Sequence, residues 1–468
     1  MADQNQGQTT QYDAYQTSLT SRYCSPAMSQ LFSQRSRHST WRKLWFFLAQ
    51  SEKELGIETI TPEALEEMEA HLVVTDSDFE IARIEEKKRR HDVMAHIHAY
   101  SIVAPSAAGI IHYGATSCFV TDNTELILMR DALDLLLPRI AKVLQNLTTF
   151  ALKWKAEPTL SWTHLQAAQL HSVGKRAAQW AQDLMFDLES IEQVRESLKF
   201  RGAQGTTGTQ ASFLEIFGGN SAKCDELNKL LCQKANFKDC YAVSTQTYSR
   251  KVDLMIANAV AGLGATAQKI CGDIRHLANW KEIEEPFEST QVGSSAMAYK
   301  RNPMRSERIY SLARELLSKP LNFANTLSDQ WMERSHNVTD GMVVYPKRIR
   351  SRVQEELPFM ITESIIMKLV AKGESRQEAH EQIRVLSHEA GYAVKHEGKP
   401  NDLVARMKNT EFFKPIWHEL DDMLRPELYI GRSVEIVERF CGEGGIVEEK
   451  LKPYKDSIEK STTAELNV

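Results

Sequence analysis

Three long apolar seams constrain the fold of this chain most. Apolar side chains recur at intervals of three or four residues from Leu170 to Leu198, and similar seams run through residues 126–147 and 254–277. This spacing places apolar side chains along one face of an α-helix. Strand-like alternation is sparse, and no Gly-x-Gly-x-x-Gly dinucleotide fingerprint occurs. We therefore expect an all-α fold with a central bundle of long helices, and no doubly wound sheet.

The chain has 468 residues, enough for several domains. We expect an N-terminal helical domain at 1–115 with a disordered tail at 1–11, a central bundle at 116–343 and a C-terminal helical domain at 344–468. Within them, Thr61 and Pro62 predict one helix start, and Asp122 with its two successors predicts the cap of a long helix.

Composition excludes several classes of partner. The net charge is −5, from 57 basic and 62 acidic residues, so we expect no nucleic-acid partner. No apolar run approaches the ~18–20 residues of a membrane helix, and the N-terminus lacks the apolar core of a secretory signal. The seven cysteines include no Cys-x-x-Cys pair, which favours reduced thiols in the cytoplasm and no metal site.

A loop of small and polar residues runs from Ser294 to Pro303, directly after Gly293. Glycine and serine favour turns, and Pro303 suits the first turn of a following helix. The helix N-terminus and nearby cations would attract an anion. These cations are Lys300, Arg301, Arg305 and Arg308. The loop is either an ordinary solvated loop or a site that holds a carboxylate or phosphate beside a serine.

Several other polar stretches carry hydrogen-bonding groups. They are Ser21–Tyr23, Arg89–His96, His112–Ser117, Leu160–Gln166 and Ser244–Arg250. On composition alone each is more simply a surface face or a structural loop. A further stretch, residues 201–210, is rich in Gly and Thr like a phosphate cradle. It lacks the lysine of a P-loop, so we reject a nucleoside-triphosphatase.

The Ser294 loop resembles the G-S-S-x-M-P-x-K-x-N-P motif of the fumarase/aspartase superfamily. The longer run S-S-A-M-x-Y-K-R-N-P-M-R-S-E-R resembles the adenylosuccinate lyase family, as do R-H-D-V-M-A-H at residues 90–96 and T-H-x-Q at residues 163–166. One departure is Ala298, where the family usually has proline. The resemblance covers roughly residues 15 to 455.

This resemblance implies β-elimination of fumarate from adenylosuccinate and from the succinyl-carboxamide imidazole ribotide, without a metal or organic cofactor. It makes Ser294 the base and His164 the acid, with Lys300 stabilising charge, and a helix N-terminus would assist Lys300. The family's members are homotetramers, and we expect active sites shared between subunits here, because the implied site residues lie on four separated stretches of the chain. Implied substrate-binding residues are Arg22, Tyr23, Arg90, His91, Asp92, Thr116, Ser117, Thr163, Gln246, Asn302, Arg308 and Arg334.

The segment after Arg334 departs strongly from the family pattern. In the family, W-x-E-R is followed by a polar segment with a phosphate-contacting Ser and Arg, and then by a long helix. Here Arg334 is separated from Gly341 by only six residues, so about two dozen residues are absent. A helix of about 25 residues spans roughly 37 Å. We therefore predict that one bundle helix is shortened or missing, and that the chain is poorly stable and weakly active or inactive.

Two alternatives stay open at this point. Another fumarate-releasing enzyme, such as an argininosuccinate lyase, would share the Ser294 loop, but the R-H-D-V-M-A-H and R-N-P-M-R-S-E-R runs argue against it. A non-catalytic subunit of a mixed oligomer would explain the shortened junction. Fumarate release from adenylosuccinate separates these alternatives.

Overall fold

The computed structural model describes residues 15–288, 290–297, 299–330 and 345–460. The chain divides into two compact units, each built from three separate stretches. Unit 1 comprises residues 1–41, 122–200 and 248–331, and unit 2 comprises residues 42–121, 201–247 and 332–468. The expected division into three domains remains a prediction.

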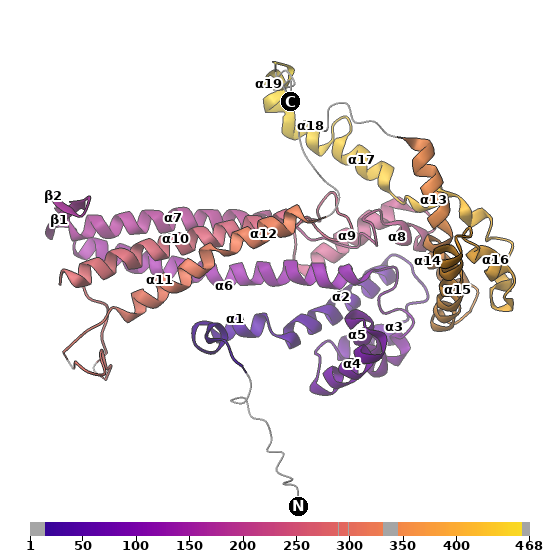
Figure 1. Ribbon diagram of the computed structural model, residues 1–468, viewed down its shortest axis with the longest axis horizontal. Helices are drawn as coiled ribbons and strands as arrows, with labels where there is room; N and C mark the ends of the chain where they lie inside the picture. The colour runs from indigo at the N-terminus through magenta and orange to yellow at the C-terminus, as the bar shows by residue number, and fades with distance from the viewer. Residues whose placement is uncertain (1–14, 289, 298, 331–344, 461–468) are drawn as a thin grey trace, which may run out of the picture. The chain divides into compact units, whose positions relative to one another are not determined.

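Unit 1 is dominated by long helices that run side by side (Figure 1). Its elements are η1 (Leu19–Tyr23), α1 (Pro26–Leu31), the start of α2 (Gln34–Glu54), most of α6 (Ser117–Lys153), β1 (Pro158–Thr163), β2 (Gln166–Ser172), α7 (Val173–Ser197), α10 (Lys251–Asn279), α11 (Met304–Leu317) and α12 (Lys319–Ser328). Helix α10 packs against α7, α11 and α12, and Ala261 and Gly264 on α10 are buried. Small residues at these positions allow helices to approach closely, so the predicted bundle is confirmed.

Unit 2 consists of shorter helices around two cores. Its elements are the rest of α2, α3 (Pro62–Ala70), α4 (Asp76–Arg89), α5 (Asp92–Val103), η2 (Pro105–Ala107), α8 (Ala211–Ile216), α9 (Ser221–Ala235), α13 (Pro346–Met360), α14 (Thr362–Ala371), α15 (Arg376–Glu397), α16 (Leu403–Lys408), η3 (Glu411–Ile416), η4 (Asp422–Leu424), η5 (Pro426–Tyr429), α17 (Ser433–Cys441), α18 (Ile446–Leu451), η6 (Lys452–Tyr454) and α19 (Lys455–Lys460). Trp45 and Tyr100 are buried in the first core, and Leu369 and Phe413 in the second. The predicted start of α3 is confirmed, since Thr61 Oγ1 accepts from Ala64 N at 3.1 Å.

Two predictions about helix boundaries were wrong. Helix α6 begins at Ser117, so Asp122 lies inside it, not at its cap. The buried Asp122 carboxylate instead accepts from Tyr248 N at 2.9 Å and from Arg250 at 3.1 Å. The seam expected to begin at Leu170 starts later, because α7 begins at Val173 and Leu170 belongs to β2.

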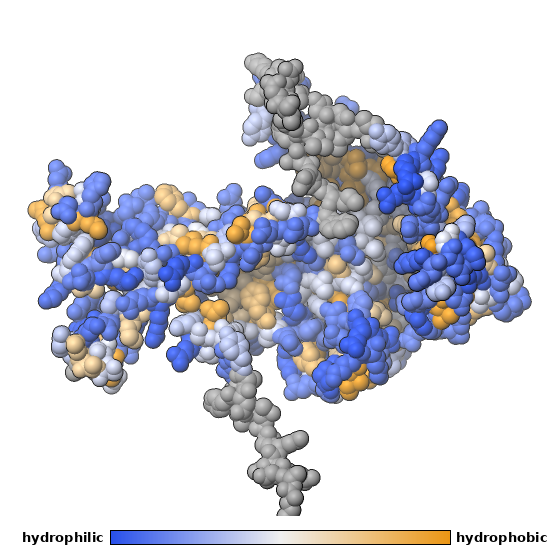
Figure 2. Space-filling view, in the orientation of Figure 1, coloured by the Kyte–Doolittle hydropathy of each residue, from blue (hydrophilic) through white to orange (hydrophobic). Residues whose placement is uncertain are grey.

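The bundle keeps a large apolar surface. Among the described residues, α10 is the one helix whose length and apolar composition would let it cross a membrane. Core helices of soluble proteins meet the same criterion. Exposed apolar side chains occur on α6, α7, α10, α11 and α12, and Figure 2 shows apolar patches on the face of the bundle that is in view. They include Val143, Leu152, Met185, Phe186, Met255, Ile309, Leu317, Leu321 and Phe323.

Candidate functional site

The serine loop, residues 291–303, connects the α10 side of the bundle to α11 and is largely exposed. Asn302 closes the loop, since its Nδ2 donates to the carbonyl of Gly293 at 2.8 Å. Gly293 is required there, because a Cβ atom would lie 2.1 Å from the carbonyl oxygen of Lys300. The loop forms no helix or strand in its described residues, as predicted.

The Ser294 side chain sits in a small cradle of backbone donors. Its Oγ accepts hydrogen bonds from the amides of Ala296 at 3.4 Å and Met297 at 3.2 Å. Donors aimed at a serine oxygen stabilise an oxyanion more than a neutral hydroxyl. The local turn therefore favours the ionised form that a serine base needs.

The helix N-terminus predicted to help Ser294 is already occupied. Glu285 accepts from the first-turn amides of α11, from Arg305 N at 3.1 Å and from Ser306 N at 2.5 Å. A carboxylate at a helix N-terminus satisfies its unpaired amides and offsets its dipole. This expectation was wrong, and Pro303 immediately precedes α11 without lying in its first turn.

Of the four cations near the serine loop, two form ion pairs within the described residues and two do not. Arg301 contacts Glu284 at 3.1 Å, and Arg305 contacts Glu288 at 2.8 Å. In contrast, neither Lys300 nor Arg308 forms an ion pair within the described part of the chain. Lys300 and Arg308 are thus the cations available for an anionic substrate.

Arg308 lines a small pocket together with Tyr23. This pocket has a volume of about 420 Å³, and its other walls come from α11. Its remaining lining residues are Met304, Glu307, Ser311 and Leu312. The structure thereby brings together two predicted substrate-binding residues that are far apart in sequence. Arg22 belongs to the same short turn, η1.

His164 occupies the tip of a β-hairpin, where sequence analysis expected a polar loop directly before a helix. Thr163 pairs with Gln166, and between them His164 and Leu165 adopt left-handed backbone with φ of 52° and 58°. Two-residue hairpin turns of this hand normally use Asn-Gly, since other residues are strained there. Such strain is concentrated at functional sites.

The hairpin is anchored at the end of the bundle. The Trp162 ring stacks on Trp280, with centroids 4.4 Å apart, and Arg176 donates to the carbonyl of Leu160 at 2.7 Å. His164 itself is exposed. The hairpin is therefore fixed where it meets the bundle, and its tip is exposed. This arrangement suits a residue that contacts a ligand lying beyond the helices of its own bundle.

In unit 2, two further predicted residues meet. His91 caps α5, where its Nδ1 accepts from Met94 N at 3.4 Å, and its Nε2 lies 3.4 Å from Ser117 Oγ. We assign the ring proton to Nε2 from this pattern. Arg90 and Asp92 flank His91, with Arg90 in left-handed backbone at the end of α4.

Thr116 and Ser117 lie where the His112–Ser117 turn enters α6. His112 belongs to the interior: Trp45 Nε1 donates to its Nδ1 at 2.9 Å, and burial, followed by Arg376 and His91, lowers the pKa of His112 to about 3. His112 is therefore a neutral structural residue that supports the turn.

The remaining predicted residues are not gathered in one cavity of either unit. Gln246 is exposed on a separate loop of unit 2. The described residues contain no hydrogen bond between His164 and the serine loop. Arg334 and the shortened junction lie outside the described residues.

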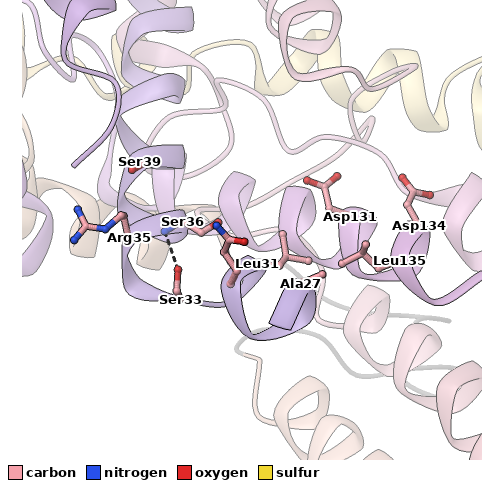
Figure 3. A pocket seen from close by; sticks show the side chains of 10 residues that line it. Ala27, Leu31, Ser33, Arg35, Ser36, Ser39, Asp131, Asp134 and Leu135 are labelled. Carbon is pink, nitrogen blue, oxygen red and sulfur yellow. Dashed lines mark hydrogen bonds between the residues drawn. The ribbon is translucent and has the colours of Figure 1, made fainter. Parts of the chain in front are cut away.

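A larger pocket of unit 1, about 610 Å³, lies between α1, α2 and α6 and contains no predicted site residue (Figure 3). Its two carboxylates come from Asp131 and Asp134. Asp134 forms a two-bond pair with Arg195 at 2.6 and 2.8 Å, and Asp131 pairs with Arg130. Both carboxylates are engaged, and we assign this pocket no chemistry.

Two important residues, Glu285 and Arg201, are not apparent from the sequence. Glu285 is one of several acidic residues in its segment, and nothing in the sequence distinguishes the one that caps α11. Arg201 is fully buried, and its contacts are with backbone carbonyls. Only the folded structure identifies either role.

Comparisons with known proteins identify the family of this chain. Residues 21–317 match the Lyase family, and residues 358–440 match the family described as adenylosuccinate lyase C-terminus. The chain is 50% identical to the adenylosuccinate lyase of Schizosaccharomyces pombe, over 96% of this chain and 98% of that protein. It is 49% identical to that of Saccharomyces cerevisiae, over 95% and 97%.

The first of these alignments also bears on the shortened junction. It spans 472 positions, whereas 96% of the 468 residues here is about 449. About two dozen positions of that relative therefore have no counterpart in this chain. The number equals that of the shortening predicted after Arg334, whose position in the chain stays a prediction.

Solved structures support the fold. A 3-carboxy-cis,cis-muconate lactonizing enzyme from Pseudomonas putida aligns with a TM-score of 0.57 at 21% identity, over 90% of this chain and 97% of that one. A fumarate lyase from Mesorhizobium aligns with a TM-score of 0.53 at 20% identity, over 88% and 96%. The chain belongs to the adenylosuccinate lyase family of the fumarase/aspartase superfamily.

Proposed function

We propose that this protein releases fumarate from adenylosuccinate, giving AMP, and from the succinyl-carboxamide imidazole ribotide. The observation that carries the proposal is the Ser294 cradle beside Lys300, a cation without an ionic partner among the described residues. A serine held by two amides, next to a cation, suits removal of a proton from carbon beside a carboxylate. A cytoplasmic location belongs to the same proposal.

The reaction is a β-elimination in two steps. Ser294, as the alkoxide, takes a proton from the succinyl carbon next to a carboxylate, and the electron pair moves into that carboxylate. The resulting doubly charged aci-carboxylate collapses, forming the double bond of fumarate and breaking the carbon–nitrogen bond. His164 gives its proton to the departing nitrogen.

Stabilising the doubly charged intermediate is the largest requirement. Lys300 supplies a positive charge on the same loop as Ser294, and Asn302 holds the loop closed. Arg308 can hold a carboxylate or phosphate through two parallel hydrogen bonds. Tyr23, which lines the same pocket, positions that anion.

The remaining predicted residues bind the rest of the substrate. His91 and Ser117 form one group in unit 2, where Ser117 lies at the first turn of α6. The amides of that turn favour a carboxylate. The other proposed substrate contacts are Arg22, Arg90, Asp92, Thr116, Thr163, Gln246 and Arg334.

We propose a homotetramer in which neighbouring subunits complete each active site. Uncovered apolar side chains along α6, α7, α10, α11 and α12 support association through the bundle. The serine loop also exposes Val292 (75%), Met297 (52%) and Tyr299 (85%). An exposed His164 without a hydrogen-bonded partner on the serine loop supports a site built from several subunits.

The shortened junction lowers stability and turnover in this proposal. A missing bundle helix leaves apolar surface uncovered, at about 25 cal/mol for each Å². It also leaves about 25 Å of extended chain to replace a traverse of roughly 37 Å. Inserting a family-like helix between Arg334 and Asn337 should raise both the melting temperature and kcat. If the unmodified chain is a stable tetramer whose kcat does not rise on insertion, this part is wrong.

The direct test is the absorbance change when adenylosuccinate is added to the purified protein, with argininosuccinate as the comparison substrate. We expect fumarate release from adenylosuccinate alone. Release from argininosuccinate alone would assign a different lyase. A folded protein that releases no fumarate from either, with or without the inserted helix, would favour a non-catalytic subunit.

A further inference from the structure

The Gly/Thr-rich stretch at residues 202–210, the seat loop, has no established role, although its composition suggests an anion cradle. Most of it is buried, and only Thr206 and Thr207 are exposed. Its glycines 202, 205 and 208 have φ values between 73° and 79°. A loop folded this tightly around its own backbone leaves few amides for a ligand.

Arg201, directly before the seat loop, is fully buried and binds carbonyl oxygens of the seat loop and of a second loop. One terminal nitrogen donates to Gly205 O at 2.9 Å and to Thr245 O at 3.2 Å, and the other donates to Gly202 O at 3.3 Å. Thr245 lies in a second loop, the glutamine loop, which comprises residues 244–247. One side chain therefore joins the two loops.

Gly208 makes the second connection between these loops. A Cβ atom on Gly208 would lie 1.9 Å from Ser244 O and 3.0 Å from Thr245 Cα. Only glycine allows the seat loop to approach the backbone of the glutamine loop so closely. The contact includes Thr245, whose carbonyl oxygen Arg201 also binds.

The glutamine loop is tightly turned, and its outer side chain is exposed. Ser244 Oγ lies within hydrogen-bond distance of Thr245 O at 3.1 Å and Thr247 O at 3.0 Å. Gln246 is exposed and forms no hydrogen bond with the described part of the chain. The loop thus presents Gln246 from a backbone that is fixed on its inner side.

The C-terminal segment also holds the seat loop, through Arg432. Arg432 is buried, donating to Gln210 Oε1 at 2.7 Å through its side chain and to Thr209 O at 2.7 Å through its amide. Gln210 in turn donates to Ala203 O at 2.8 Å. The seat loop is therefore held by the C-terminal segment as well as by Arg201.

We infer that Arg201 is a positioning residue for substrate binding: it holds the glutamine loop so that Gln246 meets the substrate. This inference rests on the proposed function, because it uses Gln246 as a substrate contact. Arg201 touches no substrate in this arrangement and acts only through the backbone of Thr245.

A double-mutant cycle on KM for adenylosuccinate tests this inference. We expect Arg201→Lys to raise KM about 3- to 10-fold, since lysine cannot bind carbonyls on both loops, and Gln246→Ala to raise it at least as much. The double variant should match Gln246→Ala alone, while kcat changes less than KM. Arg384→Lys, at an exposed arginine that pairs with Glu381, is the control and should leave KM unchanged.

Independent, multiplying effects of Arg201→Lys and Gln246→Ala on KM would overturn the inference, as would a parental KM for folded Arg201→Lys. If burial of Arg201 makes that variant unfold, Ser244→Ala loosens the same loop at a half-buried position. Ser244→Ala should raise KM in the parental protein but not in the Gln246→Ala protein. A rise in KM in both proteins would count against the inference.

Amide hydrogen exchange of residues 244–247 separates this inference from the proposed function, because it needs no substrate. We expect faster exchange in Arg201→Lys or Ser244→Ala and unchanged exchange in Arg384→Lys. Parental exchange rates in the first two variants would overturn the positioning role. Absence of fumarate release from the parental chain both with and without the inserted helix would instead count against the proposed function alone.

Discussion

The serine loop and the seat loop have similar compositions and opposite environments. Both combine glycine with hydroxyl residues next to arginine. The seat loop is mostly buried, and Arg201 beside it donates hydrogen bonds to backbone carbonyls. The serine loop is exposed, and Lys300 has no ionic partner among the described residues. The difference lies in the contacts of the nearby cation. A cation that already binds the backbone stabilises a structural loop, whereas a cation without a partner can bind an anion.

The largest expected effect concerns the acid at the hairpin tip. His164→Ala should lower kcat about 10²–10⁴-fold, because it removes general acid catalysis, while substrate binding stays largely intact. Single-turnover fumarate release and substrate binding by titration measure the two quantities. The matched control is Leu165→Ala, which changes the same turn without changing an ionisable group. A near-parental kcat in His164→Ala would contradict its role.

Mixing subunits tests whether the serine loop serves a neighbouring chain. A Ser294→Ala protein and a His164→Ala protein should each be nearly inactive, and their mixture should recover part of the parental activity if sites are shared. Subunit exchange is verified first, for example by mass-tagged chains. Mixtures that exchange fully yet stay inactive would restrict each site to one chain.

The seat loop should respond to substitution through stability. Gly208→Ala places a methyl group against Ser244 O and also strains φ, so we expect a loss of about 3 kcal/mol or more in unfolding free energy. Gly205→Ala is the matched control, because its Cβ atom would have no neighbour closer than 3.7 Å and only the φ strain, about 1–2 kcal/mol, remains. Urea unfolding measures both. Equal losses would mean that the contact with the glutamine loop is unimportant.

The turn that carries Ser117 should show a pH-dependent effect on stability. The pKa of His112 is lowered in the folded state to about 3, from an ordinary value of 6.5. As pH falls, the histidine therefore takes up a proton in the unfolded chain before it does so in the folded chain. The contribution of neutral His112 to the free energy of unfolding is fully present above pH 6.5 and is lost between pH 6.5 and 3. His112→Asn should flatten the dependence of unfolding free energy on pH in that window. An unchanged slope would show that His112 is not buried in its neutral form.

Much of the fold could be predicted from sequence, because helical seams report burial directly. The seams in α6 and α10 lie inside single helices, and Thr61 caps α3 as expected. The hairpin around His164 was missed, since its strands are short and mostly exposed and so lack apolar alternation. Asp122 carries a cap signal, but tertiary contacts with Tyr248 and Arg250 use its carboxylate instead.

The candidate site could be predicted only in part. Motifs identified Ser294, His91 and Ser117, and the structure adds the cradle around Ser294 and the contact between the other two. Glu285 and Arg201 could not be predicted, because their roles depend on which backbone groups lie within reach after folding. A charged residue that binds backbone leaves no pattern of spacing in the sequence.

The most direct test compares two adjacent hydroxyls on the serine loop. Ser294 accepts from two backbone amides, whereas Ser295 is exposed. Fumarate release from adenylosuccinate should fall about 10²–10⁴-fold in Ser294→Ala and stay near the parental rate in Ser295→Ala, in the chain with the inserted helix if the unmodified chain is too slow to measure. Equal rates for the two variants, or a larger loss in Ser295→Ala, would contradict the assignment of Ser294 as the base.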